Sequence, residues 1–370
     1  MREPGEDPDY LGRQLITCLG NKRSLLDFIG SALAVVRSRL GRDKLALFDV
    51  FSGSGAVSRF FKRYASLLVS NDLEPYSECI SRCYLANRRE LPVPLAELEK
   101  LHLGLLEKLS GPPRPGFIAE LYAPANEDHI GIGERVFYTP RNAAYIDSAR
   151  QYIGEFSGEI QPFFIAPLLS EASIHANTAG VFKGFYKDRS TGIGRFGGTG
   201  EDALRRIRGT IALPFPVFSR FECPVEIYRE DANALAGRLP ELDLAYLDPP
   251  YNQHPYGSNY FMLNLITRYE RPGALSPVSG IPPGWNRSPY NRKREAQAAL
   301  EELALGIRAK FLLVSYNSEG FIGREAMEAL LSKAGKLTVL ETPYTAFRGS
   351  RNLRNRDIHL REYLYLVEKS

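Results

Sequence analysis

Residues 45 to 55 have the sequence LALFDVFSGSG, which contains a clear strand-turn pattern. Its first seven residues are almost continuously apolar, which is typical of a β-strand buried on both faces, and SGSG then forms a tight glycine turn. The following AVSRFFKRYA (56 to 65) has the apolar spacing of a helix, and SLLVSND (66 to 72) repeats the buried strand. Strands and helices that alternate at these lengths predict an α/β fold with a parallel, doubly wound sheet.

The alternation extends on both sides of this stretch. Residues 22 to 40 precede it with helical spacing, and residues 75 to 90 follow it as a second helix that begins with proline. Helices are also expected at 293 to 308 and 324 to 334. Further strands are expected at 224–231, 242–248, 310–317, 336–344 and 362–369.

The region from residue 96 to about residue 220 does not follow this alternation. It opens with a helix, and the breaker SGPPRPG (110 to 116) then marks the start of a different subdomain. Helices are expected at 140 to 156 and 163 to 177, before a glycine-rich, basic stretch at 180 to 200. The sequence therefore predicts an α/β sheet that is interrupted by an insertion of helical, basic character.

Composition limits the class of protein. The 370 residues exceed the usual size of one domain, and 44% hydrophobic residues are enough for a sizeable core. Charged residues interrupt the apolar runs before they reach membrane-spanning length, and the N-terminal MREPGEDPDY is polar where a secretory signal requires an apolar stretch. These features predict a cytoplasmic protein that does not cross a membrane.

The cysteines and histidines do not have the spacing of a metal site. The four cysteines form no CxxC pair, and the five histidines are scattered along the chain. Cys79 and Cys83 are one turn apart on an expected helix, where small core residues are the ordinary interpretation. We therefore expect no metal and assign the cysteines no function.

Arginine-rich segments favour an anionic partner. The net charge is only +4, yet arginines concentrate in RIRG (206–209), NRSPYNRKR (286–294) and FRGSRNLRNRDIHLR (347–361). The two longer segments also contain asparagine, serine and aromatic residues, a mixture that suits phosphate contacts. The alternative is a set of solvated charged faces.

The glycine turn after the first strand is a candidate cofactor site. A G-x-G turn between a strand and a helix lets backbone amides approach a ligand where no Cβ intervenes. Asp72 ends the next strand about twenty residues after Gly53, where an acid commonly holds a ribose hydroxyl pair. The third glycine of the dinucleotide fingerprint is missing. The alternative to a cofactor site is a simple tight turn without a ligand. The turn and the acid together favour a nucleoside-type cofactor.

A second candidate site is LAYLDPPY, residues 244 to 251. A buried strand ends here abruptly in an acid, two prolines and a tyrosine. The prolines fix the backbone and leave carbonyls without intrachain donors, so the Asp248 carboxylate and the Pro249 carbonyl can jointly face a ligand's amino group. Tyr251 offers a flat ring beside them. A planar base with an exocyclic amino group satisfies all three, and a strand-terminating turn with a capping aspartate is the alternative.

Six ordered motifs resemble those of a known family: LGNKRSLLDFI, FDVFSGSG, SNDLE, REDANAL, YLDPPY and LLVSYNSEGF. Their order and spacing are similar to those of the Dam-like, alpha-group DNA adenine-N6 methyltransferases, and the resemblance spans nearly the whole chain. It implies a Rossmann-like, S-adenosylmethionine-dependent methyltransferase sheet with an inserted, mostly helical target recognition domain. The implied catalytic domain comprises residues 1–95 and 221–370, and the inserted domain comprises residues 96–220. Residues 272–292 are expected to form a flexible loop.

The resemblance also implies roles for individual residues. The cofactor-binding positions are Gly20, Asn21 and Lys22 at the methionine end, Phe51, Gly53 and Gly55 in the loop, Asp72 at the ribose, and Asp231 at the adenine of S-adenosylmethionine. The catalytic tetrad is Asp248, Pro249, Pro250 and Tyr251. The glycine-rich stretch is similar to a DNA-contacting loop of the family, which places DNA contacts at Lys183, Lys187, Arg189 and Arg195.

The implied reaction is the site-specific transfer of a methyl group from S-adenosylmethionine to the exocyclic amino group of a flipped-out adenine in double-stranded DNA, which yields N6-methyladenine. The stretches NQHPYGSNYFMLNLI and WNRSPYNRKREAQ after the tetrad resemble a subset that belongs to restriction-modification systems. A cognate restriction endonuclease is therefore a possible partner beside DNA.

Three alternatives stay open at this stage. They are an RNA adenine methyltransferase with the same cofactor site, a cytosine-N4 methyltransferase, and a catalytically silent DNA-binding protein on the same scaffold. A cytosine-N4 enzyme usually carries serine where this chain has Asp248, which disfavours that alternative. A cytosine-C5 enzyme uses a cysteine beside a proline as its nucleophile, and Cys223 does precede Pro224, but well away from the DPPY turn.

Overall fold

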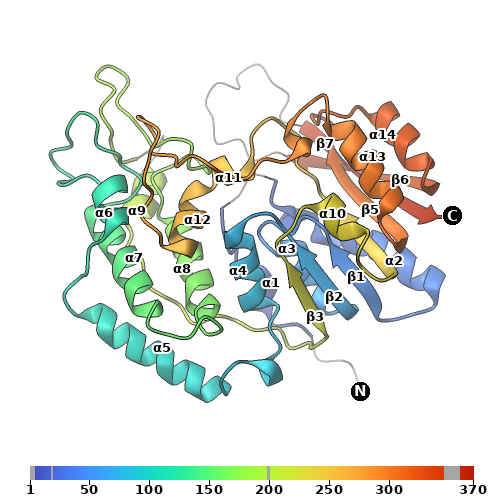
Figure 1. Ribbon diagram of the computed structural model, residues 1–370, viewed down its shortest axis with the longest axis horizontal. Helices are drawn as coiled ribbons and strands as arrows, with labels where there is room; N and C mark the ends of the chain where they lie inside the picture. Colours follow the sequence, from blue (N-terminus) through green and yellow to red (C-terminus); the bar gives the residue numbers. More distant parts are fainter. Residues whose placement is uncertain (1–4, 18–19, 198–200, 346–358) are drawn as a thin grey trace.

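The computed structural model describes residues 5–17, 20–197, 201–345 and 359–370, and it has a seven-stranded sheet at the right of Figure 1. The strand order is β3-β2-β1-β4-β5-β7-β6, which is the α/β class that the sequence predicts. The strands are β1 (Leu45–Asp49), β2 (Ala65–Asn71), β3 (Val225–Tyr228), β4 (Leu242–Leu247), β5 (Ala309–Asn317), β6 (Gly335–Thr345) and β7 (His359–Lys369).

Strand β7 runs against its neighbours. The pairs among β1 to β5 are parallel, whereas β7 pairs antiparallel with both β5 and β6. The expectation of an all-parallel sheet is therefore wrong at this edge. Residues 346–358, which join β6 to β7 and lie outside the described residues, have a polar sequence without the apolar spacing of a crossover helix. Parallel neighbours need such a crossover, so antiparallel pairing follows.

Neighbouring side chains of each inner strand enter two separate cores. Leu47 of β1 belongs to one hydrophobic cluster and Phe48 to another, and Leu244 and Ala245 of β4 repeat this division. Helices cover both faces, which is why these strands are continuously apolar rather than alternating. The first cluster includes α2 (Leu26–Leu40) and α3 (Ala56–Lys62), and the second includes α10 (Ala232–Ala236), α13 (Ala296–Gly306) and α14 (Arg324–Ser332).

The chain between α4 and β3 forms a helical lobe at the left of Figure 1. Its buried residues share one hydrophobic cluster with α4 (Pro75–Tyr84) and α12 (Phe261–Arg268). Phe137 of the lobe, for example, packs edge-on against Phe261 with ring centroids 5.9 Å apart. This shared core fixes the lobe against the sheet. The lobe helices are α5 (Leu95–Ser110), α6 (Phe117–Tyr122), α7 (Pro140–Ile153), α8 (Pro162–Ile174) and α9 (Glu201–Arg208).

Some short elements have no clear signal in the sequence. Residues 22–40, expected as one helix, are divided into a 3-10 turn, η1 (Lys22–Leu25), and α2. The Asn21 side chain accepts the N–H of Arg23 and so starts the chain in the tighter turn. The other short elements are α1 (Pro8–Gly12), η2 (Arg88–Glu90), α11 (Tyr256–Asn259) and η3 (Pro289–Asn291).

Among the described residues, no helix combines the length and the hydrophobicity that a bilayer-spanning segment needs.

Candidate functional site

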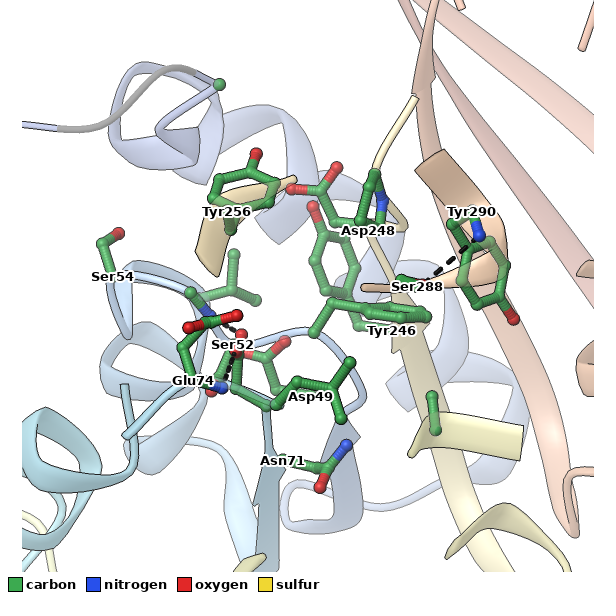
Figure 2. A pocket seen from close by; sticks show the side chains of 18 of the residues that line it. Asp49, Ser52, Ser54, Asn71, Glu74, Tyr246, Asp248, Tyr256, Ser288 and Tyr290 are labelled. Atoms are coloured by element: carbon green, nitrogen blue, oxygen red, sulfur yellow. Dashed lines mark hydrogen bonds between the residues drawn. The ribbon is translucent and has the colours of Figure 1, made fainter. Parts of the chain in front are cut away.

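A cavity that is partly open to solvent lies where β1, β2 and β4 end. Ligands of open α/β sheets bind at this edge. Figure 2 shows Asp248 and Tyr256 facing each other at one end of the cavity, with Asp49 and Asn71 further in. The cavity brings together the two sites that the sequence singles out, the glycine turn and the DPPY turn.

The glycine turn forms one wall of the cavity. Gly53 and Gly55 have φ angles of 51° and 71°, in the left-handed region that a residue with a Cβ rarely adopts. The N–H of Gly53 donates to Asp72 Oδ2 at 2.8 Å, and the N–H of Glu74 donates to Oδ1 at 2.9 Å. Burial raises the pKa of Asp72, while these backbone bonds act to lower it. One carboxylate thus ties the glycine turn to the end of β2.

Asp49, the last residue of β1, is a buried acid in the cavity wall. Its side chain is 1% exposed, and the Ser58 hydroxyl donates to Oδ2 at 2.6 Å. No described residue donates a hydrogen bond to Oδ1. Burial raises the pKa of Asp49 to about 7. Sequence reasoning missed this residue, although an acid inside an otherwise apolar strand was an available signal.

Asp248 follows β4 directly and forms an ion pair with Lys22. Lys22 Nζ lies 3.1 Å from Asp248 Oδ1 and 2.9 Å from Glu362 Oε1. Burial acts to lower the pKa of Lys22, but the two carboxylates raise it well above its usual value. Burial also raises the pKa of Asp248 to about 6, because the attraction of Lys22 offsets only part of the desolvation. At neutral pH the site therefore holds a charged lysine beside an ionised aspartate.

The other residues of the DPPY turn surround Asp248. Pro250 lines the cavity, whereas Pro249 is buried and is not part of the lining. Tyr251 is half-buried, and its ring lies edge-on to Tyr316 with centroids 6.4 Å apart. A Cβ placed on Gly20 would lie 3.5 Å from the Tyr251 hydroxyl oxygen. The N-terminal motif and the tyrosine therefore meet beside the cavity.

The remaining predicted cofactor residues also converge. Gly20, Asn21, Phe51 and Asp231 line the cavity, and Gly55 lies just outside the lining. Phe51 packs edge-on against Tyr290 at 5.2 Å. Asp231 is exposed at the rim, where its Oδ1 caps α10 by accepting the N–H groups of Asn233 and Ala234.

Residues 272–292, which the sequence marks as a flexible loop, contribute a wall that the sequence did not predict. Asn286, Ser288, Tyr290 and Asn291 line the cavity. The Asn286 amide donates to the Leu73 carbonyl at 2.8 Å, and this bond joins the loop to the turn after β2. No local pattern marks these residues, because the loop reaches the cavity through contacts between segments far apart in sequence.

Glu74 connects the cavity to α12. The carboxylate is 3% exposed and accepts a hydrogen bond from Asn264 of α12 at 2.5 Å. Burial raises the pKa of Glu74 to about 7. A polar contact thus runs from the cavity wall to a helix that packs against the helical lobe.

The four predicted DNA-contacting residues are exposed and lie outside the cavity lining. Three of them, Lys187, Arg189 and Arg195, are on a hairpin-like loop, in which the Arg195 N–H donates to the Tyr186 carbonyl at 2.9 Å. In Figure 1 this light-green loop projects from the top of the helical lobe. Ser190 and Thr191 each donate hydrogen bonds from the hydroxyl and the backbone N–H to Asp188 Oδ1. These bonds close the tip of the loop.

Lys183 contacts the loop that follows the DPPY turn. Its Nζ is 3.2 Å from Nδ1 of His254, in the loop that follows Tyr251. The N–H of Phe182 also donates to the Asn259 carbonyl at 2.7 Å. The start of the glycine-rich stretch is therefore attached to the loop beside Asp248.

The three described cysteines do not line the cavity. Cys79, Cys83 and Cys223 are buried free thiols, and Cys18 is outside the described residues. Burial raises the pKa of Cys79 to about 12, which keeps it protonated and unreactive. In the part of the chain that the structure describes, no group of three or more His, Cys, Asp or Glu side chains could hold a metal ion.

Comparisons with known proteins agree with these features. The family model for D12 class N6 adenine-specific DNA methyltransferases matches residues 19–193 and 213–277. The Type II methyltransferase M.NlaIII of Neisseria lactamica is 29% identical over 363 residues, which cover 95% of this chain and 99% of that protein. M.CviAII of Paramecium bursaria Chlorella virus 1 is 29% identical, with 94% and 97% covered. M.FokI of Planomicrobium okeanokoites is 26% identical, with 95% and 52% covered.

Proposed function

Because this chain belongs to the D12 class of N6 adenine-specific DNA methyltransferases, its reaction is site-specific methylation of adenine in DNA, and we propose that the cavity between the glycine turn and Asp248 is where that reaction occurs. The observation that carries the proposal is the ion pair between Lys22 and Asp248 at one end of the cavity, with the glycine turn and Asp72 at the other.

The cavity has the properties that S-adenosylmethionine requires. Asp49 Oδ1, which accepts no hydrogen bond from any described residue, suits the ammonium group of the methionine moiety. Asp72 retains lone pairs beside its two backbone bonds and suits the ribose hydroxyls. When bound, S-adenosylmethionine supplies a methyl group activated on a sulfonium. We assign its binding to Gly20, Asn21, Lys22, Asp49, Phe51, Gly53, Gly55, Asp72 and Asp231.

The adenine must leave the DNA duplex to reach this cavity, because its amino group is paired and stacked inside the helix. Extrusion costs a few kcal/mol. Stacking on an aromatic ring contributes about 1–3 kcal/mol, so Tyr251 offsets much of that cost. The remainder comes from contacts between the protein and the rest of the DNA.

Asp248 acts on the amino group. The lone pair of that nitrogen is delocalised into the adenine ring, which makes the nitrogen a poor nucleophile. Hydrogen bonds from the amino group to the Asp248 carboxylate and the Pro249 carbonyl favour a pyramidal nitrogen whose lone pair points at the methyl carbon. The nitrogen gains positive charge as the new bond forms, and its surplus proton leaves to water through the Asp248 carboxylate. Lys22 keeps this carboxylate ionised and oriented.

DNA recognition is assigned to residues 96–220, which make up most of the helical lobe, and the catalytic domain to residues 1–95 and 221–370. The hairpin with Lys187, Arg189 and Arg195, together with Lys183, presents positive charge outside the cavity. Some of these side chains contact phosphates and others contact base edges. The Lys183–His254 contact places part of this surface beside the catalytic turn.

The biological context follows from the relatives. M.NlaIII and M.CviAII are named Type II methyltransferases, and they match nearly the whole of this chain. We infer that this protein is the modification enzyme of a restriction-modification system, works in the cytoplasm, and has a cognate restriction endonuclease that cuts the same site when it is unmethylated.

The test is expression of the chain in a host that lacks DNA methylation, followed by long-read mapping of modified bases. We expect one short sequence motif to be methylated at the N6 position of adenine. Competition between duplex DNA and RNA for labelled methyl groups distinguishes a DNA adenine methyltransferase from an RNA adenine methyltransferase. A genome without modification, with the protein folded and soluble, would contradict the proposal.

A further inference from the structure

Glu362 of β7 is a buried charged residue that has no role in methyl transfer as proposed for Asp248 and Lys22. Its side chain is 1% exposed, and it lies behind Lys22 rather than in the cavity lining. Oε1 accepts hydrogen bonds from Lys22 Nζ at 2.9 Å and from the Ser315 hydroxyl at 2.7 Å. A buried carboxylate is costly, so its presence next to the catalytic ion pair calls for an explanation.

We propose that Glu362 is a positioning residue for methyl transfer, which shares the Lys22 ammonium with Asp248 and thereby keeps the Asp248 carboxylate oriented and basic enough to hold the adenine amino group. The inference rests on the proposed role of Asp248. It adds a residue from the opposite end of the chain, on a strand that none of the cofactor or catalytic motifs includes.

The geometry explains how one lysine serves two acids. Lys22 Nζ lies between Asp248 Oδ1 and Glu362 Oε1, at 3.1 Å and 2.9 Å. The Ser315 hydroxyl fixes the Glu362 oxygen from β5, which pairs with β7. Lys22 has three donor positions, so it can bond both acids and keep a fixed direction. Without Glu362, the ammonium would lose one of the two bonds that hold it.

The charges also bear on how basic Asp248 is. The titratable side chains that act on Asp248 in the described structure are Lys22, Glu362, Tyr246 and Asp49. Lys22 attracts the charge of Asp248, whereas Glu362 repels it and raises the pKa of Asp248. A carboxylate with a higher pKa is a stronger hydrogen-bond acceptor and a better proton acceptor. Glu362 therefore limits how far Lys22 lowers the basicity of Asp248.

The test is a pH profile of single-turnover methyl transfer with DNA and cofactor saturating, from about pH 4.5 to about pH 8.5, so that it includes a limb shifted below that of wild type. The rate of wild-type protein should rise with the ionisation of Asp248. Glu362→Gln keeps the shape and an oxygen acceptor but removes the charge, so the rising limb should move down by about one pH unit. The plateau rate should fall about tenfold, less than when a group that contacts the substrate is lost. Glu368→Gln, on an exposed part of the same strand, is the matched control and should leave the profile unchanged.

Ser315→Ala is a second test, for which the expected shift of the pH profile has the opposite direction. It also serves as the test if the Glu362→Gln variant fails to fold. This change leaves the charge on Glu362 but removes its hydroxyl donor, so Glu362 should draw Lys22 away from Asp248 and move the limb to higher pH. An unchanged limb in the folded Glu362→Gln or Ser315→Ala variant would overturn the inference, even if the rate fell, because packing alone would then explain Glu362. If wild-type protein transferred no methyl group at all, the proposed function itself would fail.

Discussion

The backbone N–H of Gly53 and the carboxylate of Asp72 are joined by a 2.8 Å hydrogen bond across the end of the sheet. Asp72 therefore has a structural task before any ligand binds, since it holds the glycine turn in its left-handed conformation. Its other oxygen accepts the N–H of Glu74 at 2.9 Å. We therefore expect a substitution at Asp72 to change the shape of the turn and to remove the acceptors that we propose for the ribose hydroxyls.

Asp72→Ala should weaken S-adenosylmethionine binding by several-fold to a hundredfold or more, because hydrogen bonds to a charged acceptor contribute about 1.5–3 kcal/mol each. Asp72→Asn keeps one oxygen acceptor and should fall between the alanine variant and wild type. Isothermal titration calorimetry measures both affinities. An affinity equal to that of wild type in a folded Asp72→Ala protein would remove Asp72 from the cofactor site.

The buried Asp49 carboxylate should lower the stability of the ligand-free protein and strengthen the binding of S-adenosylmethionine. Burial raises its pKa to about 7, above the value of 3.8 for an unperturbed aspartate. The folded protein therefore holds a proton that the unfolded chain releases, and the free energy of unfolding should fall as pH rises from about 4 to about 7. Asp49→Asn should stabilise the ligand-free protein at pH 8 by about 1–3 kcal/mol, with no gain near pH 4.

The same substitution should weaken cofactor binding, because the ammonium group of the ligand would lose its buried counter-charge. Urea unfolding at pH 4 and pH 8, with calorimetry at pH 8, checks both effects. Asp128→Asn, on the exposed surface, is the control for loss of a single negative charge. If Asp49→Asn destabilised the ligand-free protein at pH 8, the buried acid would have an unrecognised partner.

Alanine substitutions at Lys183, Lys187, Arg189 and Arg195 should separate phosphate contacts from base contacts. A phosphate-contacting residue lowers affinity for all DNA sequences and reduces the salt dependence by about one unit of slope, whereas a base-reading residue relaxes target choice. Binding titrations at several salt concentrations, with target and non-target duplexes, measure these effects. Lys100→Ala is the control, because Lys100 is 79% exposed on α5, at the opposite end of the helical lobe in Figure 1. Unaltered binding in all four variants would place DNA recognition elsewhere, and residues 272–294 would be the next segment to test.

Tyr251→Ala should weaken capture of the flipped base rather than cofactor binding. A 2-aminopurine at the target position fluoresces when it is unstacked, so it should stay dimmer in the complex with this variant than with Asp248→Ala. Tyr251→Phe keeps the ring and should resemble wild type. Equal fluorescence with the alanine and phenylalanine variants would show that the ring does not support the extruded base.

Local patterns predict much of this fold. The continuous apolar runs of β1 and β4 mark strands covered on both faces, and the turns that end them carry the glycines and the DPPY residues. Parallel strands that end at one edge bring such turns together, so a shared site follows from the topology. The antiparallel β7 was missed because strand direction depends on the connection and not on the strand's own sequence.

The rest of the site depends on contacts between distant segments. Glu362 meets Lys22 across almost the whole length of the chain, and neither residue carries a local signal for that pairing. Asn286 and Tyr290 lie in a loop with strong turn residues, which predict a loop but not where it packs. Asp49 was detectable in principle, since an acid in an apolar strand requires a reason.

We propose that Asp248 acts on the amino group during the chemical step. The decisive experiment is rapid-quench measurement of single-turnover methyl transfer by Asp248→Ala, with DNA and cofactor saturating. The rate should fall by at least two to three orders of magnitude, the scale observed when one preorganised electrostatic partner is removed, while cofactor affinity changes little. A folded Asp248→Ala protein that methylates adenine at nearly the wild-type rate would show that the turn after β4 only terminates a strand.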